Sequence, residues 1–515
     1  MTVERNELEP HATLTELATE IPGSRIVGDP SLEVRDVQHD ARDVQPGDAF
    51  VARRGQKRDG AEFAPDAIAR GAKLIITERE LPLPVAQLVV ADAHRALAFA
   101  SSAVWRHPSF SLEVLGVTGT NGKTTTTWLI EHVLERCGVK TGLLGTVAHR
   151  FRDRSWPALH TTPESDDLAR RMAAMRAAGA ENLAMEVSSH ALALGRVEAV
   201  RFRVAAFTNL TQDHLDFHGS MDAYAAAKRR LFTDLGPAAS VLNVDDATGS
   251  KWASEGVNGL LVTYSASGKV DDAMFCARTA TADARGMHAV VDTPDGRFEL
   301  FTPMFGWHNL ENVLCAAACA WALDIPAARA FEALRTAVGA PGRLERVHVD
   351  DEGPLVFVDY AHSPDALTNV LRALDQQKRG RILCVFGCGG DRDVTKRAPM
   401  GDAVGRGATV PVLTTDNPRT EDPARIASMA EEGLRALGLN SCAESELRDA
   451  RGGKYAVILD RRAAIRAAID AAAPEDIVLI AGKGHEPYQE IDGVRHPFDD
   501  RFEAHAALTA RRARG

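Results

Sequence analysis

The chain of 515 residues is 45% hydrophobic and 25% charged, which is the composition of an ordinary globular protein. Its formal net charge of −11 argues against a nucleic-acid-binding protein, because such proteins carry basic surfaces. None of the seven cysteines forms a CxxC pair, so the sequence indicates neither a disulfide framework nor a structural zinc site and favours a cytoplasmic protein. The polar start MTVERNELEPH predicts no signal peptide. The longest apolar run, VLCAAACAWAL, is too short to span a bilayer and predicts a buried helix.

The first part of the chain predicts a small α/β domain. Three short apolar runs, AFVA, KLIITE and QLVVAD, have the composition of strands, and no glycine-rich phosphate loop occurs among them. At ordinary domain sizes the chain length predicts about three domains. We therefore expect domains at residues 1–110, 111–340 and 341–515.

The stretch GVTGTNGKTTTTWL predicts a phosphate-binding loop. SLEVLGV before it is typical of a buried strand that ends near Val117, and KTTTTWLIEHVLER after it has helical spacing. Gly119 and Gly122 would let backbone N–H groups close around phosphate oxygens at the positive end of the helix. Lys123 can then reach the β- and γ-phosphates, and the hydroxyl of Thr124 can bind Mg²⁺. Because the strict Walker pattern has a glycine at position 117, a glycine-rich turn with an exposed lysine is the alternative.

Two further strand ends carry side chains suited to a metal ion. Glu186 ends the apolar run LAME, and TNLTQDHLDFHG follows another predicted strand and supplies His214. The predicted helix SMDAYAAAKRRLF then carries Lys228. Ligands bind at the carboxyl ends of strands in α/β sheets, so these groups could hold a metal ion beside the phosphate loop, although each could also be structural. The alanine-rich RRMAAMRAAGA predicts a surface helix.

Residues 341–515 contain a second alternation of strands and helices. The apolar runs LVFVDYAH, RILCVFG, VPVLTTD and IVLIAGKG are each followed by helical sequence, which predicts a parallel sheet with crossover helices. Ser363 is expected to cap a helix whose first turn contains Pro364. His362 would therefore lie at a strand-to-helix junction, either facing a site or serving only in the cap.

A series of motifs resembles the Mur ligase family, the ATP-dependent amide-bond-forming enzymes of peptidoglycan synthesis. The motifs are GTNGKTTTT, TTP, MEVSSHAL, TNLTQDHLDFHG, AAAKRRLF, GWHNLENV, PGRLERV, VDYAHSPDAL, GCGGDRD, TTDNPR and AGKGHE, in this order through nearly the whole chain. The resemblance implies an α/β fold of three domains: a small N-terminal UDP-sugar domain, a central P-loop ATPase-type domain with a parallel sheet, and a C-terminal Rossmann-like domain that brings the amino acid. We expect a cytoplasmic monomer that binds small molecules, binds no nucleic acid and has no membrane span.

Within the family, the chain is similar to ligases that add meso-2,6-diaminopimelate to UDP-N-acetylmuramoyl-L-alanyl-D-glutamate. The implied reaction transfers the γ-phosphoryl group of ATP to the D-glutamyl γ-carboxylate, and the amine of the amino acid then displaces phosphate from the acyl phosphate. The implied catalytic residues are Lys123, Lys228 and His214. The implied ligands of Mg²⁺ are Thr124, Glu186, His214 and Lys228, the last in carbamylated form. ATP contacts are implied for Gly119, Thr120, Asn121, Gly122, Lys123, Thr124, Thr125, Asn309, Asn312, Arg343, Asp359 and His362.

The stretch TTDNPR bears on the amino-acid substrate. Meso-diaminopimelate differs from lysine by a second carboxylate, and an arginine is the side chain best suited to bind it with two hydrogen bonds. Arg419 supplies that group, and lysine as substrate would leave it unpaired. A turn that DNP would form in any case is the alternative. The full set implied for diaminopimelate is Arg392, Asp416, Asn417, Pro418, Arg419, Gly482 and Glu486.

The contacts to the UDP-sugar follow the family pattern less closely. The implied residues are His39, Ala41, Gln56, Lys57, Thr161, Thr162, Ser188, Leu194 and Arg196. The family often has a serine where Ala41 stands and a glutamine where Leu194 stands.

Three alternatives remain open. A lysine-adding ligase of the same family would share every motif except DNPR. Folylpolyglutamate synthetase shares the GTNGK loop, but DNPR and the N-terminal domain argue against it. A P-loop switch ATPase would hydrolyse ATP without an amino-acid acceptor.

Overall fold

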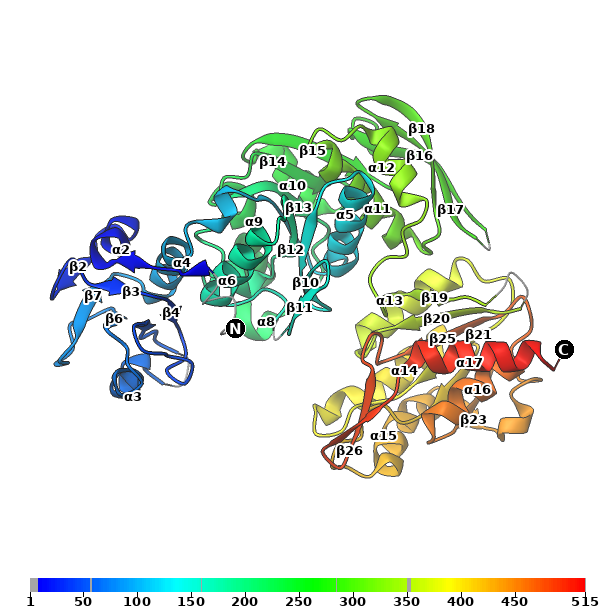
Figure 1. Ribbon diagram of the computed structural model, residues 1–515. Coiled ribbons are helices and arrows are strands. Elements are labelled where there is room, and N and C mark those ends of the chain that lie inside the picture. The colour runs from blue at the N-terminus through cyan, green and yellow to red at the C-terminus, as the bar shows by residue number, and fades with distance from the viewer. Residues whose placement is uncertain (1–7, 56–57, 159, 284, 350–352, 515) are drawn as a thin grey trace. The chain divides into compact units, whose positions relative to one another are not determined.

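The computed structural model describes residues 8–55, 58–158, 160–283, 285–349 and 353–514 (Figure 1). Its contacts divide the chain into two compact units. Unit 1 comprises Met1–Ala280, Ala289–Thr302 and Glu311–Ala337, and unit 2 comprises Thr281–His288, Pro303–Leu310 and Val338–Gly515. The boundary predicted at residue 110 falls inside unit 1 and stays a prediction.

The N-terminal part of unit 1 is built on a five-stranded sheet. Its elements are β1 (Ala12–Thr13), α2 (Leu14–Glu20), β2 (Arg25–Val27), β3 (Glu33–Val34), β4 (Val37–Gln38), β5 (Ala49–Val51), α3 (Ala64–Ala69), β6 (Leu74–Thr77), β7 (Ala86–Val89) and α4 (Ala93–Val104). The strand order is β2-β7-β6-β5-β4, with β2 antiparallel and the rest parallel. The three runs predicted as strands are β5, β6 and β7, so these predictions are confirmed.

An eleven-stranded sheet follows, in the order β11-β10-β9-β12-β8-β13-β14-β15-β16-β17-β18. The strands are β8 (Glu113–Thr118), β9 (Thr141–Leu144), β10 (His149–Phe151), β11 (Arg154–Trp156), β12 (Asn182–Glu186), β13 (Phe202–Phe207), β14 (Ala239–Asn243), β15 (Leu260–Ser265), β16 (Phe275–Asp283), β17 (Gly286–Thr293) and β18 (Gly296–Thr302). The helices are α5 (Lys123–Arg136), α6 (Ser165–Ala177), α7 (Ser189–Ala193), α8 (Leu215–His218), α9 (Met221–Thr233), α10 (Ala247–Glu255), α11 (Trp307–Trp321) and α12 (Ala327–Leu334). The strands from β9 to β15 in this order run parallel, as predicted.

The predicted strand–loop–helix unit is confirmed, because β8 ends at Thr118 and α5 begins at Lys123. The apolar run in α11 is a buried helix, also as predicted. The prediction that RRMAAMRAAGA lies on the surface is wrong. It forms most of α6, where Met172 and Met175 belong to the core of the central sheet while Ala169 and Ala173 belong to the N-terminal core. Alanine on this helix permits close packing on two sides.

Unit 2 contains a seven-stranded sheet in the order β19-β20-β25-β21-β22-β24-β23. Its elements are β19 (Glu345–Val347), β20 (Leu355–Asp359), α13 (Pro364–Asp375), β21 (Ile382–Phe386), α14 (Arg397–Gly407), β22 (Val410–Leu413), α15 (Pro423–Ala436), β23 (Asn440–Ser441), β24 (Lys454–Val457), α16 (Arg461–Ala471), β25 (Ile477–Ala481), β26 (Tyr488–Ile491), β27 (Val494–Pro497) and α17 (Asp500–Arg512). Only β19 is antiparallel to its neighbour among the pairs from β19 to β23. One core lies under α13, α14 and α15, and a second lies under α16 and α17 (Figure 1).

No helix within the described part of the chain is long and apolar enough to cross a membrane.

Candidate active site

The predicted phosphate loop is held in place by the segment that follows β13. The backbone N–H of Thr120 donates to the carbonyl of Asn209 at 2.8 Å, and that of Asn121 donates to Oδ1 of Asn209 at 3.0 Å. Gly119 has φ +149°, and a Cβ atom built on it would lie 1.9 Å from Oγ1 of Thr208. A side chain at this position would therefore push the loop away from β13.

Two lysines converge on one carbonyl oxygen of this loop. Nζ of Lys123 donates to the carbonyls of Gly119 at 2.8 Å and Thr120 at 2.7 Å, and Nζ of Lys228 donates to the same Gly119 carbonyl at 2.8 Å. Lys228 is 1% exposed. Burial, together with the charge of Lys123, lowers the pKa of Lys228 well below its ordinary value, and Asp213 opposes this shift. The side chain thus has access to the neutral amine form.

Glu186 lies at the end of β12 and joins the loop to two threonines. Its Oε2 accepts from the hydroxyls of Thr124 at 3.0 Å and Thr146 at 3.2 Å, while Oε1 accepts from the backbone N–H of Thr146 at 2.7 Å. Carboxylate and hydroxyl oxygens are the hard donors that Mg²⁺ prefers. Thr124 and Glu186 therefore fit the predicted Mg²⁺. The described residues contain no cluster of three His, Cys, Asp or Glu side chains that could hold a metal ion by themselves.

His214 does not share the hydrogen bonds of the other predicted metal ligands. It adopts a left-handed φ of 52° at the start of α8, and its ring lies edge-on to that of His190 with centroids 4.8 Å apart. Its nearest carboxylate is that of Asp213, at 3.4 Å. Throughout the described chain, neither Glu186 nor Lys228 is hydrogen-bonded to this ring.

Asn309 and Asn312 are both buried near the start of α11. Oδ1 of Asn312 accepts from the hydroxyl of Thr126 at 3.2 Å and packs against Gly122, where a Cβ atom would lie 2.4 Å from it. Nδ2 of Asn309 donates to the carbonyl of Phe305 at 2.7 Å. The hydroxyl of Thr126 thus anchors α5 to α11. Thr125 is buried as well.

In unit 2, three predicted nucleotide residues lie at the carboxyl end of β20. Asp359 accepts from the backbone N–H groups of Leu344 at 2.6 Å and Ala361 at 2.8 Å. Burial raises the pKa of Asp359, although Arg343 opposes the shift. Arg343 stacks over the ring of Tyr360 at 4.7 Å, and Nδ1 of His362 lies 2.7 Å from the Tyr360 carbonyl oxygen.

The predicted UDP-sugar residues of the central region form a connected group. The hydroxyl of Thr162 donates to the carbonyl of Glu186 at 2.8 Å and accepts from the backbone N–H of Ser188 at 3.0 Å. Arg196 donates to the carbonyl of Thr162 at 3.1 Å and pairs with Glu164 at 2.5 Å. Thr161 lies 3.1 Å from the hydroxyl of Thr146, and Leu194 is the half-buried C-cap of α7.

The predicted UDP-sugar residues of the N-terminal region lie beside α6. Nδ1 of His39 lies 2.9 Å from both carboxylate oxygens of Asp166, and this contact raises the pKa of His39 although burial opposes it. Arg170 lies behind this pair and contacts Asp166 at 3.1 Å and Asp36 at 2.9 Å. Ala41 is buried. Gln56 and Lys57 lie outside the described residues.

The predicted diaminopimelate residues gather at the carboxyl ends of β22 and β25. Asp416 and Asn417 follow β22, and Nδ2 of Asn417 donates to Oε2 of Glu486 at 2.9 Å. Burial raises the pKa of Asp416, opposed by Arg461 and Lys483. Gly482 has φ +118°, and a Cβ atom there would lie 2.9 Å from Oδ2 of Asp416, so only glycine allows this close approach.

Arg419 extends from the same loop. It has φ 53°, and its backbone exchanges hydrogen bonds with Glu490 and Asp492 of the β26–β27 hairpin. Its guanidinium donates to the carbonyl of Gly390 at 2.5 Å. A Cβ atom on Gly389 would lie 3.3 Å from this guanidinium and 3.8 Å from the side chain of Arg392, so both predicted arginines flank the glycine pair. Pro418 is buried behind them.

Arg461 connects the two loops of this site. Its guanidinium, fully buried, pairs with Asp500 at 2.7 Å. It also donates to the carbonyl of Ala481 at the end of β25, at 2.9 Å, and to that of Thr415 after β22, at 3.4 Å.

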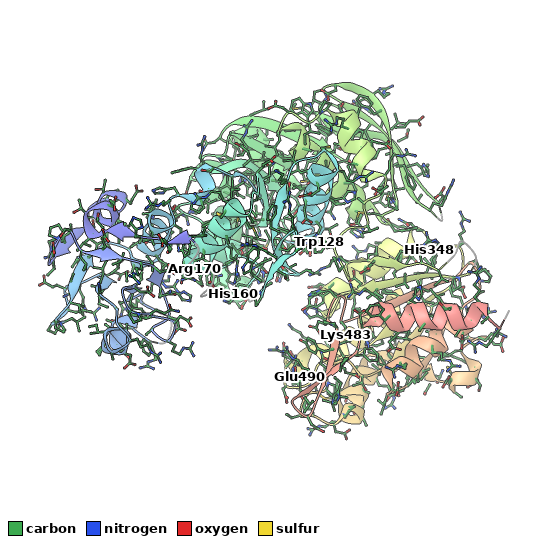
Figure 2. All side chains as sticks on the ribbon, viewed as in Figure 1. Trp128, His160, Arg170, His348, Lys483 and Glu490 are labelled. Atoms are coloured by element: carbon green, nitrogen blue, oxygen red, sulfur yellow. The ribbon has the colours of Figure 1, made fainter. Side chains whose placement is uncertain are left out.

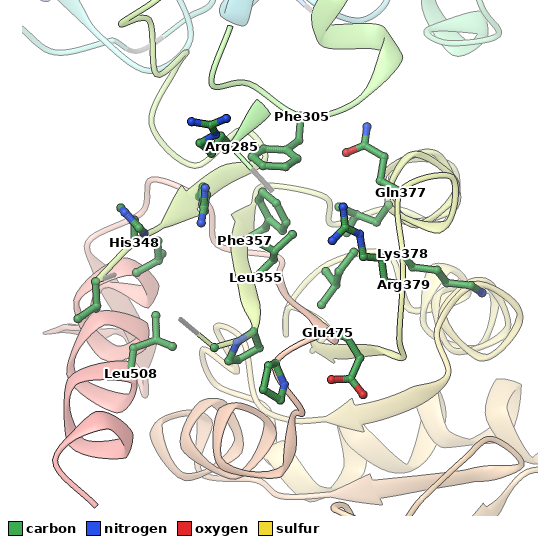
Figure 3. A pocket seen from close by; sticks show the side chains of 18 of the residues that line it. Arg285, Phe305, His348, Leu355, Phe357, Gln377, Lys378, Arg379, Glu475 and Leu508 are labelled. Atoms are coloured by element: carbon green, nitrogen blue, oxygen red, sulfur yellow. The ribbon is translucent and has the colours of Figure 1, made fainter. Parts of the chain in front are cut away.

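A separate pocket lies at the amino ends of the parallel strands of unit 2. Leu355, Phe357, Gln377 and Glu475 are among its lining residues (Figure 3). Leu355 begins β20, whereas Asp359 and Asp416 lie at or beyond carboxyl ends of strands. None of the residues that line this pocket was predicted for the site.

Besides Arg461, sequence reasoning missed four further residues that hold the site together: Thr146, Glu164, Tyr224 and Lys483. Thr146 follows β9, Glu164 follows TTP and Lys483 lies within AGKGHE, so the position of each after a strand or motif was an available signal. Tyr224 contacts the hydroxyl of Thr120 at 3.2 Å and lies under Nζ of Lys228, 4.4 Å from the ring centre. Only its place one helical turn before Lys228 indicated this.

Comparisons with known proteins agree with this arrangement. Family models match residues 33–111 (Mur ligase family, catalytic domain), 117–320 (Mur ligase middle domain) and 342–484 (Mur ligase, glutamate ligase domain). The UDP-N-acetylmuramoyl-L-alanyl-D-glutamate–2,6-diaminopimelate ligase of Synechococcus elongatus is 44% identical over 493 residues, which are 94% of this chain and 95% of that protein. The ligase of the same name from Geobacter metallireducens is 42% identical over 98% of this chain and 99% of its own.

A solved structure of a ligase with this name has a TM-score of 0.72 and 32% sequence identity, and the match covers 97% of this chain and 99% of that one. The ranges that the family models match include the phosphate loop and the strand ends that carry Glu186 and Asp416. The chain therefore belongs to the Mur ligase family.

Proposed function

We propose that this Mur ligase uses ATP to join meso-2,6-diaminopimelate to the γ-carboxylate of the D-glutamyl residue of UDP-N-acetylmuramoyl-L-alanyl-D-glutamate. The relatives at 42–44% identity that carry this name support the assignment. The enzyme would act in the cytoplasm, as a monomer, with three domains divided near residues 110 and 340.

The first step activates a poor electrophile. The carboxylate oxygen attacks the γ-phosphorus of ATP, the bond to the β-phosphate oxygen breaks, and ADP leaves with the electron pair. Lys123 and the backbone N–H groups of Gly119 to Thr125 would bind and orient the phosphates. Mg²⁺, held by Thr124 and Glu186, would neutralise phosphate charge when bound.

The second step forms the amide bond. The neutral amine of diaminopimelate attacks the carbonyl carbon of the acyl phosphate, and phosphate leaves with the electron pair of the broken C–O bond. The observation that most supports this acceptor is the cluster of Asp416, Asn417 and Glu486 beside Arg419. This cluster offers carboxylates for an ammonium group and a guanidinium for the distal carboxylate.

Lys228 is proposed to be carbamylated. Nζ of the neutral amine attacks the carbon of CO₂, an N–C bond forms, one C–O π bond becomes a carboxylate, and a proton leaves. The burial of Lys228 and its lowered pKa favour the reacting amine form. The product would be an anionic oxygen ligand near the loop, with His214 as its partner.

The test compares two arginines only six residues apart. Arg419→Ala is expected to lower kcat/KM for diaminopimelate by 10- to 100-fold and to remove the preference over lysine, because one charged pair is lost. Arg425→Ala, an exposed arginine of α15, is the control and should change neither value. If Arg419→Ala keeps the native preference, the pocket assignment is wrong. A native enzyme that prefers lysine would be the lysine-adding ligase.

Two measurements separate the ligase from a P-loop switch ATPase. The ligase should release phosphate only when both the UDP-sugar peptide and diaminopimelate are present. Oxygen-18 placed in the D-glutamyl carboxylate should appear in that phosphate, since the acyl phosphate carries one of its oxygens. Hydrolysis that is independent of both substrates would favour the switch.

A further inference from the structure

Lys483 is a fully buried lysine at the centre of the predicted acceptor cluster. It follows β25, and its side chain is 0% exposed (Figure 2). Its Nζ donates to Oδ1 of Asn417 at 3.0 Å and to Oε2 of Glu486 at 3.4 Å, and lies 3.7 Å from Oδ1 of Asp416. All three partners belong to the set predicted to bind diaminopimelate. A buried ammonium is costly unless it is paired, so its presence indicates a specific role.

The first consequence is that the amide of Asn417 has one orientation. Its Oδ1 accepts from Lys483 and from the backbone N–H of Glu490 at 3.0 Å, and its Nδ2 donates to Glu486. Rotating the amide by half a turn would place its NH₂ group against the ammonium and its oxygen against a carboxylate. Lys483 therefore fixes which atom of Asn417 faces Glu486.

The second consequence concerns charge. Asp416 and Glu486 contribute two negative charges, Lys483 contributes one positive charge, and Arg461 is balanced by Asp500. These five side chains, counted without Arg419, together carry one net negative charge. Oδ1 of Asp416 is buried and has no hydrogen-bond donor among the described residues. An ammonium group of a ligand would supply both the missing charge and the missing donor.

We propose that Lys483 is a positioning residue for the amino-acid substrate. Lys483 fixes Asn417 and Glu486 in place and leaves the cluster with one net negative charge, which a single ammonium group of the substrate neutralises. This inference rests on the proposed function. It adds a residue that need not touch the substrate but determines how tightly the amino acid binds.

The experiment measures KM for each of the three substrates in Lys483→Met, which keeps an unbranched side chain one atom shorter and removes its charge. KM for diaminopimelate should rise at least tenfold, while KM for ATP and for the UDP-sugar peptide should stay within twofold. Arg381→Met is the matched control, because Arg381 is a buried cation at the amino end of the same sheet, paired with Asp476. It should lower thermal stability and leave all three KM values unchanged.

A double variant adds a readout that a purely structural role would not give. Glu486→Gln removes one negative charge, so Lys483→Met with Glu486→Gln restores the net charge of the cluster. The double variant should therefore have a KM for diaminopimelate no higher than that of Lys483→Met alone. If the KM of the double variant rises by the product of the rises in the two single variants, the two side chains act independently and the proposal is overturned.

Other outcomes are equally decisive. An unchanged KM for diaminopimelate in Lys483→Met, or an equal rise in all three KM values, would overturn the proposal. Should Lys483→Met fail to fold, Lys483→Gln, which keeps a donor for Asn417 but has no charge, is measured against the same expectations. If the wild-type enzyme does not use diaminopimelate, the proposed function itself is refuted. The wild-type assay therefore distinguishes a failure of the proposed function from a failure of this inference.

Discussion

Replacement of Arg170 by methionine is expected to destabilise unit 1 more than any surface substitution. Arg170 lies on α6, and its guanidinium contacts Asp36 at 2.9 Å, Asp166 at 3.1 Å and Asp167 at 2.8 Å. It also donates to the carbonyl of Val37 at 3.0 Å. The side chain thus ties β4 of the N-terminal sheet to a helix of the central region. Methionine keeps much of the volume but none of these bonds.

The magnitude follows from burial. Asp36 and Asp166 are each 1% exposed, so without Arg170 both carboxylates would remain in the interior with too little compensating charge. Breaking a buried ion pair by removing one partner costs about 3–5 kcal/mol. Asp166 keeps His39 and Asp36 keeps the indole N–H of Trp105 at 2.9 Å, so we expect the lower part of this range, about 3 kcal/mol.

The loss should depend on pH, with a definite sign. In the native protein, Arg170 and His39 outweigh burial and hold the pKa of Asp166 well below its ordinary value, so Asp166 stabilises the fold at neutral pH and loses this contribution as the pH falls. Burial already raises the pKa of Asp36 in the native protein although Arg170 opposes it, and in the variant burial should raise the pKa of Asp36 further and also that of Asp166. Protonation then relieves the uncompensated charge, and the deficit should be largest at pH 8 and smaller at pH 5.

The assay is urea unfolding followed by tryptophan fluorescence at both pH values. Five of the six tryptophans, all except Trp307, belong to unit 1, and Trp105 donates directly to Asp36, so most of the signal reports on this region. Arg176→Met on the same helix is the control. Within the described residues the side chain of Arg176 donates only to backbone carbonyls, so its loss should cost about 1 kcal/mol or less. A deficit below about 1 kcal/mol at pH 8, or one that is equal at pH 5, would refute the reasoning. KM for the UDP-sugar peptide should also rise, because His39 is anchored to Asp166.

Burial and two neighbouring aspartates raise the pKa of Glu311 to about 7, whereas a glutamate in the unfolded chain loses its proton near its ordinary value of 4.5. The folded protein therefore retains a proton that the unfolded chain releases, and stability falls as the pH rises between these values. Glu311→Gln should be more stable than the native protein by up to about 3 kcal/mol at pH 8 and equally stable at pH 4.5, as measured by urea midpoints; equal midpoints at pH 8 would contradict this. Gly119→Ala should abolish ATP binding in calorimetry while the far-UV spectrum is retained, because its Cβ would clash with Thr208. Labelled bicarbonate should give a carbamate carbon signal in the NMR spectrum that is absent from Lys228→Ala, and a signal that persists in the variant would assign it elsewhere.

The elements with strong local signals were predictable from the sequence. The loop between β8 and α5 is marked by glycines between an apolar run and a helical pattern, and Ser363 caps α13 as predicted, accepting from the N–H of Ala366 at 3.3 Å. Local chemistry alone determines both. The family resemblance supplied most of the site residues, and its assignment of the chain to the Mur ligases is confirmed.

Features that depend on contacts between distant segments were not predictable. The side of α6 that packs on the N-terminal core carries only alanines, Ala169 and Ala173, among its core residues, so the sequence pattern predicts a surface helix. A lysine between two glycines in a loop is expected to be exposed. Only the fold shows that Lys483 is enclosed by Asp416, Asn417 and Glu486. The predicted roles of His214 and Lys228 toward a metal ion stay predictions.

The guanidinium of Arg461 has a mechanical consequence for the acceptor loops. Because one rigid planar group bonds carbonyls at the base of both loops, a shift of the segment after β22 would drag the segment after β25 with it. The two loops should thus move as one rigid unit, and their hydrogen-exchange rates should change together. The amino-acid specificity of this enzyme could then be changed by exchanging side chains on this rigid unit. Grafting one loop without the other would fail.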